Sequence, residues 1–279
     1  MNVTDEELGC FIRTLRDSGG YDLSDYSDKS LKRRLQKVLD DSRLPFGIFM
    51  GNIKQDRLFA EKVLKDITVN TTELFRDPQM WQTLRHRILP RFKANKTINI
   101  WHAGCSTGQE VYSMIILLNE MGLLDKAKIV ATDINNDVLD VARKGQYKYR
   151  FNIGYLDNFD QVMKHNPFNY DEVYDVSYEK YFVIDKAKDI LSIKKEYTEI
   201  PFFRKHDLVK DGTFVYAKFD IVFCRNVIIY FNNKLQNNVF NLFHQNLYPK
   251  GCLILGAHEA ILGPWAPRFE KNGSFYTKK

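Results

Sequence analysis

The chain has 279 residues, of which 44% are hydrophobic and 27% are charged, and its formal net charge is +6. This composition is that of an ordinary globular protein, and it excludes the disordered and fibrous classes. A chain of this length removes about 75% of its unfolded surface from water, enough for one large domain and a second, smaller one. The excess of basic residues does not by itself decide whether the partner is nucleic acid, a membrane surface or an acidic protein.

The cysteines and histidines show no spacing typical of metal ligands or of a disulfide framework. The longest purely aliphatic or Met run, Met114–Leu118, is far short of the roughly 18 residues of a membrane span. No charged-then-apolar leader precedes Cys10. We therefore expect a cytoplasmic protein with no metal, no disulfide and no membrane insertion.

The first 67 residues predict a small all-helical unit. Apolar residues recur at helical spacing in three stretches, namely Leu8, Phe11, Ile12 and Leu15, then Leu31, Leu35, Val38 and Leu39, then Phe59, Val63 and Leu64. The polar segment Asp66–Asp77, which is followed by Pro78, is the expected boundary. We expect residues 1–67 to form a helical N-terminal domain, residues 68–77 a linker, and residues 78–279 the large domain.

From Ile98 onward, short apolar runs alternate with long amphipathic segments. The strands predicted from these runs are Ile98–Ala103, Ile129–Thr132, Asp220–Cys224 and Cys252–Gly256. Strands that alternate with helices favour right-handed crossovers. We therefore predict an α/β fold in which a parallel sheet has helices on both faces.

The alternation is interrupted between about residues 144 and 212. Candidate short strands in this polar, aromatic stretch are Tyr181–Ile184, Ile190–Ile193 and Thr198–Phe202. We expect an inserted antiparallel β-subdomain here, followed by a return to the main sheet at Pro201–Leu208.

Two strand ends indicate a nucleoside-binding site. The strand that ends at Ala103 runs into a turn in which Gly104 and Gly108 allow a ligand to approach the backbone, before a helix N-terminus with free amides. An isolated turn of this kind is as often purely structural as it is ligand-binding. The spacing of its glycines is not that of nicotinamide-binding proteins. Asp133, at the end of the next strand, can accept hydrogen bonds from both ribose hydroxyls.

A third strand ends in the apolar and aromatic run Cys224–Phe231, where Asn226 is the informative polar residue. Its amide can hydrogen-bond an amino-acid moiety or a substrate, although such runs are more often core than pocket. The sequence has a glycine turn and a carboxylate that can bind ribose, but it lacks the diphosphate-binding fingerprint. This combination fits S-adenosylmethionine better than a dinucleotide.

Four motifs together resemble the CheR family, the glutamate methyltransferases of chemotaxis receptors. They are Asn70–Asp77, Ala103–Glu110 followed by Tyr112 and Ser113, Ala131–Ile134, and Cys224–Phe231. The resemblance covers nearly the whole chain, including the basic N-terminal helix and the inserted β-subdomain. It implies a Rossmann-like class I methyltransferase sheet and methyl transfer from S-adenosylmethionine to receptor glutamates, with S-adenosylhomocysteine as the second product.

The resemblance also assigns roles to individual residues. The residues that it implies in cofactor or substrate contacts, beside Gly104 of the glycine turn, are Asn70, Thr72, Arg76, Glu110, Asp133, Asn226 and Val227. Arg76 would orient the incoming carboxylate through its planar fork, the alternative being a surface arginine paired with Asp77. Tyr230 would line the methyl-transfer site or belong to the core.

Two positions depart from the family pattern. His258 stands before Glu259, where the family usually has a serine. The segment Phe203–Leu208 contains Asp207 where the family tends to have Asn-Leu. Asp207 can accept a hydrogen bond from the adenine amino group, and a solvated turn aspartate is an equal alternative.

Five basic residues lie on the helix predicted around residues 29–39, with no acidic residue between the first and the last of them. They are Lys29, Lys32, Arg33, Arg34 and Lys37. Lys29, Arg33 and Lys37 fall four apart and form one stripe, which the other two flank. A basic helix face is more often merely solvated. The resemblance favours docking to the acidic, helical methylation region of the cytoplasmic domains of chemotaxis receptors.

Other functions stay open at the level of sequence. A nucleic-acid or other protein methyltransferase is one alternative. Enzymes that methylate the amino groups of nucleic-acid bases commonly carry an Asp/Asn-Pro-Pro-Tyr/Phe motif, whereas the corresponding segment Asn226–Ile229 has no proline. We therefore expect no nucleic-acid partner. A catalytically silent S-adenosylmethionine-binding module that docks on receptors is the alternative outside enzymes.

Overall fold

The computed structural model describes residues 3–68, 72–212 and 218–279. The chain divides into two compact units. One comprises Met1–Asn70 and Val227–Phe240, and the other comprises Thr71–Asn226 and Asn241–Lys279. We call them the helical unit and the sheet unit.

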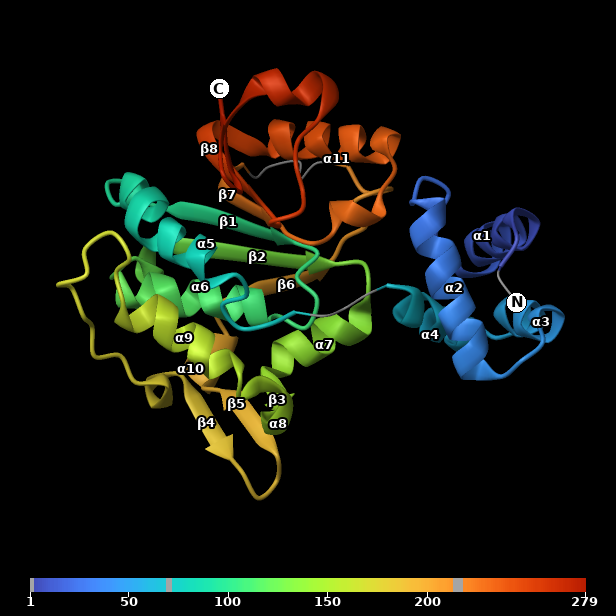
Figure 1. The fold of residues 1–279 in the computed structure, drawn as a ribbon, viewed down its shortest axis with the longest axis horizontal. Coiled ribbons are helices and arrows are strands. Elements are labelled where there is room, and N and C mark those ends of the chain that lie inside the picture. The colour runs from blue at the N-terminus through green and yellow to red at the C-terminus, as the bar shows by residue number, and fades with distance from the viewer. Residues whose placement is uncertain (1–2, 69–71, 213–217) are drawn as a thin grey trace. The chain divides into compact units, whose positions relative to one another are not determined.

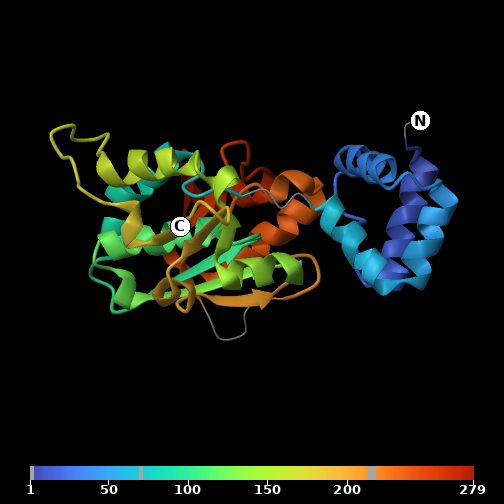
Figure 2. The same cartoon turned by 90° about the horizontal axis from the view of Figure 1, so that it is seen from below.

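Four helices make up most of the helical unit (Figures 1 and 2). Their bounds are α1 (Asp5–Gly19), α2 (Asp28–Ser42), α3 (Phe46–Gln55) and α4 (Arg57–Ile67). A capping box starts α1, because the Thr4 hydroxyl accepts from the Glu7 amide and the Glu7 carboxylate accepts from the Thr4 amide. The same helix ends at Gly20, which is left-handed with φ 74°.

The apolar faces of these helices meet in one buried cluster. Phe11, Leu15, Leu35 and Phe49 in this cluster have no exposed surface. Burial of such faces, more than intrinsic propensity, stabilises helices of this length. The helical character predicted for this part of the chain is confirmed.

Every strand of the described residues lies in the sheet unit. Their bounds are β1 (Ile98–Ala103), β2 (Ala127–Asp133), β3 (Gln146–Lys148), β4 (Phe182–Asp185), β5 (Ile190–Ile193), β6 (Phe202–Lys205), β7 (Phe219–Cys224), β8 (Leu247–Leu255), β9 (Phe269–Asn272) and β10 (Phe275–Lys278). Its helices are α5 (Pro78–Thr83), α6 (Gln109–Glu120), α7 (Asn136–Lys144), α8 (Tyr149–Asn152), α9 (Tyr155–Lys164) and α10 (Lys195–Thr198). The helix α11 (Asn233–Asn246) is shared between the two units.

Seven strands form one mixed sheet in the order β6-β2-β1-β7-β8-β10-β9. The first five are parallel, and the hairpin β9–β10 adds two antiparallel strands. The parallel register pairs Ala103 with Thr132 and His102 with Phe223, so β1, β2 and β7 end at the same edge. Helices cover both faces of the sheet (Figure 1). The predicted α/β fold is confirmed.

The inserted sheet is antiparallel, with strand order β3-β5-β4. It ends at Ile193, and the strand expected at Thr198–Phe202 is wrong. Residues Lys195–Thr198 form a helical turn, and the next strand, β6, starts at Phe202 and pairs with β2. The chain therefore returns to the main sheet within Pro201–Leu208, as expected.

Strand β8 begins five residues before the predicted start, at Leu247. The sequence Pro249-Lys250-Gly251 consists of residue types that favour turns. In the structure it lies within β8, where the register against β7 shifts and Lys250 adopts φ 64°. An irregularity of this kind lets turn-forming residues stand inside a strand.

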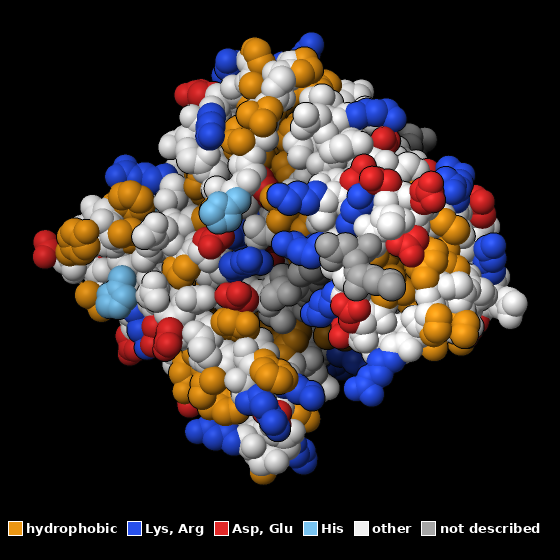
Figure 3. Space-filling view, turned by 45° about the vertical axis from the view of Figure 1, so that its right-hand side comes forward, with side chains coloured by type: hydrophobic (Ala, Val, Ile, Leu, Met, Phe, Trp, Pro, Cys, Tyr) orange, Lys and Arg blue, Asp and Glu red, His pale blue; other side chains and the backbone are white. Residues whose placement is uncertain are grey.

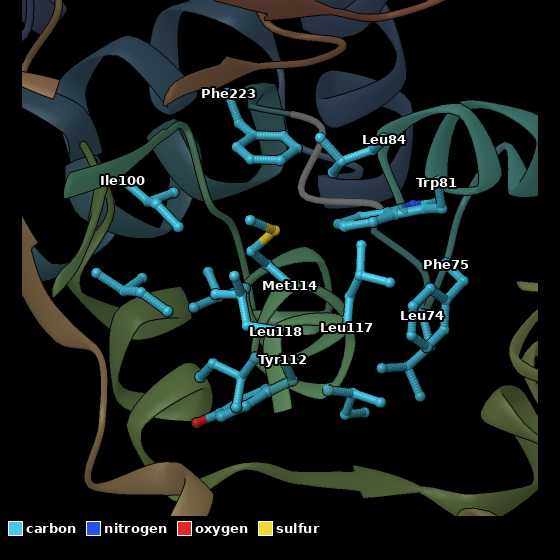
Figure 4. Packing of buried hydrophobic residues seen from close by; sticks show 14 of the residues in the cluster. Leu74, Phe75, Trp81, Leu84, Ile100, Tyr112, Met114, Leu117, Leu118 and Phe223 are labelled. Atoms are coloured by element: carbon cyan, nitrogen blue, oxygen red, sulfur yellow. The ribbon is translucent and has the colours of Figure 1, made fainter. Parts of the chain in front are cut away.

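The core of the sheet unit fixes the segment that precedes α5. Trp81 of α5 stacks on Phe223 of β7 with ring centroids 5.8 Å apart, and Phe75 packs edge-on against Trp81 at 5.5 Å (Figure 4). Met114 and Leu117 of α6 are fully buried in the same cluster. Residues 74–81 are thereby packed against β7 and α6.

Substitution of Gly108 by alanine is expected to lower the free energy of unfolding by about 2 to 4 kcal/mol, as measured by urea denaturation. Gly108 has φ 90°, and a Cβ atom there would lie 2.9 Å from the Cβ of Ala142 in α7. Gly108 is thus required for helix packing. Gly122 is the matched control, since it has φ 64° and open space around it. Equal losses for Gly108→Ala and Gly122→Ala would exclude the packing explanation.

Candidate active site

The candidate site lies at the edge where β1, β2 and β7 end. The turn after β1 is tied to β2, because the amides of Gly104 and Cys105 both donate to the Thr132 carbonyl, at 2.8 and 2.9 Å. Gly104 has φ 76°, Ser106 has φ 51° and Gly108 has φ 90°, so the turn passes three times through the left-handed region. Such a path exposes backbone amides on one side, as anion- and nucleotide-binding turns do.

Asp133 is buried at the end of β2. Its two carboxylate oxygens accept hydrogen bonds from the amides of Ser106 (2.9 Å) and Asn135 (3.0 Å). Burial raises the pKa of Asp133, although the amides of Asn135 and Ser106 oppose the shift. A carboxylate has about four lone-pair sites, so it can still accept from a ligand hydroxyl.

A second carboxylate, Glu110, lies at the start of α6. His102 Nδ1 is 2.9 Å from one of its oxygens, and Arg225 Nη1 donates to the other at 3.1 Å. Burial opposes its ionisation, but the hydrogen bond from His102 and the charge of Arg225 hold the pKa of Glu110 below its ordinary value. Glu110 is therefore an ionised acceptor inside the protein.

Arg225, directly after β7, joins three segments of the site. Its side chain is 3% exposed, and Nη2 donates to the Arg76 carbonyl at 3.0 Å and to the Asp77 carboxylate at 2.6 Å. Sequence reasoning missed this residue. The available signal was a charged residue within an apolar run, because a buried arginine requires partners.

Asn226 adopts a left-handed conformation with φ 58°, held by the loop after β8. Its amide and that of Gly256 both donate to one carboxylate oxygen of Glu259, at 2.8 and 2.7 Å. Glu259 is 7% exposed, whereas the neighbouring His258 is exposed. The loop thus holds Asn226 through Glu259, which sequence reasoning also missed.

The structure brings the Arg76 backbone to the site. Its carbonyl accepts from both Arg225 and the indole of Trp81, the latter at 3.0 Å. Burial and the charge of Glu73 raise the pKa of Tyr155 at the start of α9, and the charge of Arg76 opposes them. Thr72 is half-buried, and Asn70 lies outside the described residues.

Val227 and Tyr230 belong to the helical unit. The Arg34 guanidinium lies 3.8 Å from the centre of the Tyr230 ring, and the Ser27 amide donates to the Tyr230 carbonyl at 2.8 Å. Arg34 also donates to the Ile67 carbonyl at 2.7 Å.

The basic residues of α2 do not share one environment. Arg34 is 8% exposed, so its prediction as a docking residue is wrong. Its guanidinium instead contacts the Ile67 carbonyl and the Tyr230 ring within the helical unit. Lys32 pairs with Asp5 of α1. Lys29, Arg33 and Lys37, which form the predicted stripe, are exposed.

Two buried polar atoms at the site, Nε of Arg225 and Nε2 of His102, have no hydrogen-bond partner among the described residues. Unpaired buried groups are rare and call for an explanation such as solvent or a ligand. In the part of the chain that the structure describes, no cluster of three or more His, Cys, Asp and Glu side chains could hold a metal ion. No helix in the described ranges is long and apolar enough to cross a membrane.

A largely parallel sheet with a left-handed turn after β1, a buried aspartate at the end of β2 and an asparagine after β7 is a Rossmann-like fold with its site at the carboxyl ends of the strands. The family model described as "CheR methyltransferase, SAM binding domain" matches residues 70–157 and 162–273. The chain belongs to this family, and S-adenosylmethionine is its cofactor.

Whole-chain relatives agree with this membership. The Cher3 protein of Pseudomonas putida is 34% identical over 96% of this chain and 93% of its own length. A chemotaxis protein methyltransferase of Vibrio anguillarum is 31% identical, covering 94% and 92% of the two chains. One from Listeria innocua is 30% identical, covering 91% and 90%.

Proposed function

We propose that the protein transfers a methyl group from S-adenosylmethionine to glutamate side chains of chemotaxis receptors, which yields glutamyl methyl esters and S-adenosylhomocysteine. The observation that carries this proposal is the hydrogen-bonded network that joins Glu110 to the backbone of Arg76 through Arg225. The network links Glu110, which would bind the cofactor amino group, to the segment that carries Arg76, whose guanidinium would suit a substrate carboxylate. The Vibrio and Listeria relatives are named chemotaxis protein methyltransferases, which supports the same proposal.

The cofactor fits the residues present. The bound cofactor supplies an electrophilic methyl group on a sulfonium ion. Asp133 would accept from the ribose hydroxyls, and the ionised Glu110 from the amino group. The other residues proposed to contact the cofactor are Asn70, Thr72, Arg76, Gly104, Asn226 and Val227.

The chain needs no general base for this reaction. An unperturbed glutamate has a pKa near 4.3, so at pH 7 the attacking carboxylate is already ionised. The protein contributes orientation and exclusion of water. Arg76 would orient the carboxylate, and Tyr230 would line the path of the methyl group.

The exposed stripe of Lys29, Arg33 and Lys37 on α2 is the proposed receptor-docking surface, with Lys32 at its side. Basic and acidic side chains are interspersed over the face drawn in Figure 3. An acidic helix of the receptor is the partner that a basic helix face fits.

Methyl-labelled S-adenosylmethionine tests the proposal. The protein is incubated with a receptor cytoplasmic fragment, with the same fragment carrying alanine at its methylatable glutamates, and with RNA. We expect label only on the first substrate, and we expect mild alkali to release it, because esters hydrolyse where N-methyl groups do not. Alkali-stable label, or label on RNA, would contradict the proposal.

A further inference from the structure

We propose that Arg225 is a positioning residue. It holds the segment that bears Arg76 in place relative to Glu110, the residue proposed to bind the cofactor amino group. The inference rests on the roles proposed for Arg76 and Glu110 and adds a residue that sets their mutual geometry. Arg225 is thereby distinguished from an arginine that only stabilises the fold.

The contacts of Arg225 carry the inference. Nη1 reaches Glu110 on α6, while Nη2 reaches the carbonyl of Arg76 and the carboxylate of Asp77. The partners are 115, 149 and 148 residues away in the sequence. One side chain, 3% exposed, thus bonds to two segments that the sheet topology alone does not bring together.

The segment that Arg225 holds is strained. Phe75 and Asp77 have φ of 51° and 58°, a conformation that non-glycine residues rarely adopt. Strain of this kind persists only where surrounding contacts fix the backbone. Here the contacts are the Ser113 hydroxyl, which accepts from the Phe75 amide at 2.8 Å, the Trp81 indole, and Arg225. Without Arg225, Arg76 is left between two strained residues with one fewer support.

The Glu110 side of the network is rigid. Its other oxygen is held by His102, whose ring stacks on Phe223 at 4.4 Å and 9°. Phe223 in turn stacks on Trp81, which bonds to the Arg76 carbonyl. Arg225 therefore closes a ring of contacts from Glu110 through His102, Phe223 and Trp81 to Arg76.

Lysine cannot replace arginine in this role. The guanidinium is a planar fork whose two Nη atoms donate in different directions at once, whereas an ammonium is a single point charge on a flexible stem. The substitution Arg225→Lys keeps the charge near Glu110 and Asp77 but loses the simultaneous contacts. It therefore separates positioning from charge balance.

The matched control is Arg85→Lys in the same unit. Arg85 is also buried, 7% exposed, and its Nη1 donates to the carbonyls of Val162 and Met163 at 2.7 and 3.0 Å. It lies outside the network of Glu110 and Arg76. Any general cost of losing a buried guanidinium should appear in both variants.

Amide hydrogen exchange of the full-length protein is the primary measurement, together with calorimetry of S-adenosylhomocysteine binding. In Arg225→Lys we expect exchange in residues 72–81 to rise about tenfold and affinity to fall about 3- to 10-fold. On a receptor fragment, kcat should fall at least tenfold while KM stays within threefold. In Arg85→Lys, exchange should rise around residues 162–163 only.

Two variants keep the inference falsifiable. If Arg225→Lys does not fold, Asp77→Asn weakens one arm of the network at an exposed carboxylate, because the amide keeps an acceptor oxygen but loses the charge, and a rise of about threefold in exchange over residues 72–81 is expected. The inference is overturned if exchange in residues 72–81 and cofactor affinity match the parent in the folded variants. If the parent itself does not methylate receptor while exchange and affinity change as expected, the proposed function fails and the positioning role stands.

Discussion

Replacing Asp133 with alanine is expected to weaken binding of S-adenosylhomocysteine by about 10- to 100-fold. A hydrogen bond to a charged group contributes about 1.5 to 3 kcal/mol, and 1.4 kcal/mol corresponds to a tenfold change in affinity. Asp133 is buried, so water cannot substitute for the lost acceptor at little cost. Isothermal titration calorimetry measures the change, and circular dichroism checks the fold.

Two further variants separate ligand binding from support of the turn. Alanine also removes the acceptor of the Ser106 and Asn135 amides, whereas Asp133→Asn keeps one acceptor oxygen and loses the charge. An intermediate affinity is expected for Asp133→Asn. Asp140→Ala removes an exposed carboxylate that pairs with Arg143 on α7 and should leave affinity at the parental value. Parental affinity in Asp133→Ala would remove this residue from the site.

The Asp133 carboxylate also predicts a dependence on pH. Burial, opposed in part by the amides of Asn135 and Ser106, raises its pKa, and the ionised form is the acceptor. Affinity should therefore be full above the raised pKa and fall as the pH drops through it, at a higher pH than for an ordinary aspartate. The part of the fall that is due to Asp133 should be absent in Asp133→Asn, because asparagine does not titrate in this range.

The central strands could be predicted from sequence because each is a short apolar run bounded by turn residues. Ile98–Ala103 and Ile190–Ile193 have the predicted bounds. Strands β9 and β10 were not predicted. Three of the four residues of Phe269–Asn272 are exposed, since β9 is an edge strand that pairs only with β10. Its stability comes from pairing, which local hydrophobicity does not reveal.

The site could be predicted as far as residues at strand ends determine it. Parallel strands end at one edge, so Gly104, Asp133 and Asn226 were expected near one another. Arg225 and Glu259 were not found, because their roles depend on partners that only the folded chain brings close. For such residues, a single sequence carries the residue type but not the contact.

The misplacement of Arg34 has a different cause, because the sequence did contain the signal. Leu31, Arg34 and Val38 are spaced by three and four residues, and this spacing puts them on one helix face. All three are buried. Periodicity therefore assigns Arg34 to the apolar face, whereas counting basic residues along the helix put it on the docking surface.

The exposed stripe on α2 leads to the second prediction. Reversing two of its charges, in the double variant Arg33→Glu and Lys37→Glu, should raise the apparent KM for a receptor fragment about tenfold or more at low salt. Both side chains are exposed, so the reversal replaces attraction to receptor carboxylates by repulsion without removing a buried contact. Added salt shortens the screening length from about 10 Å at 0.1 M and so weakens the attraction in the parent. The variant has less attraction to lose, so the salt dependence of its KM should be flatter.

The control must carry the same net charge. Arg13→Glu with Lys62→Glu changes two exposed basic residues on α1 and α4 of the same unit, which lie outside the stripe. It reproduces any effect of overall charge, so its KM should rise much less. Affinity for S-adenosylhomocysteine should be parental in both double variants. If Arg33→Glu with Lys37→Glu methylates receptor as well as the control does at low salt, the stripe is a solvated face, and recognition must involve other surfaces, such as the inserted sheet β3-β5-β4.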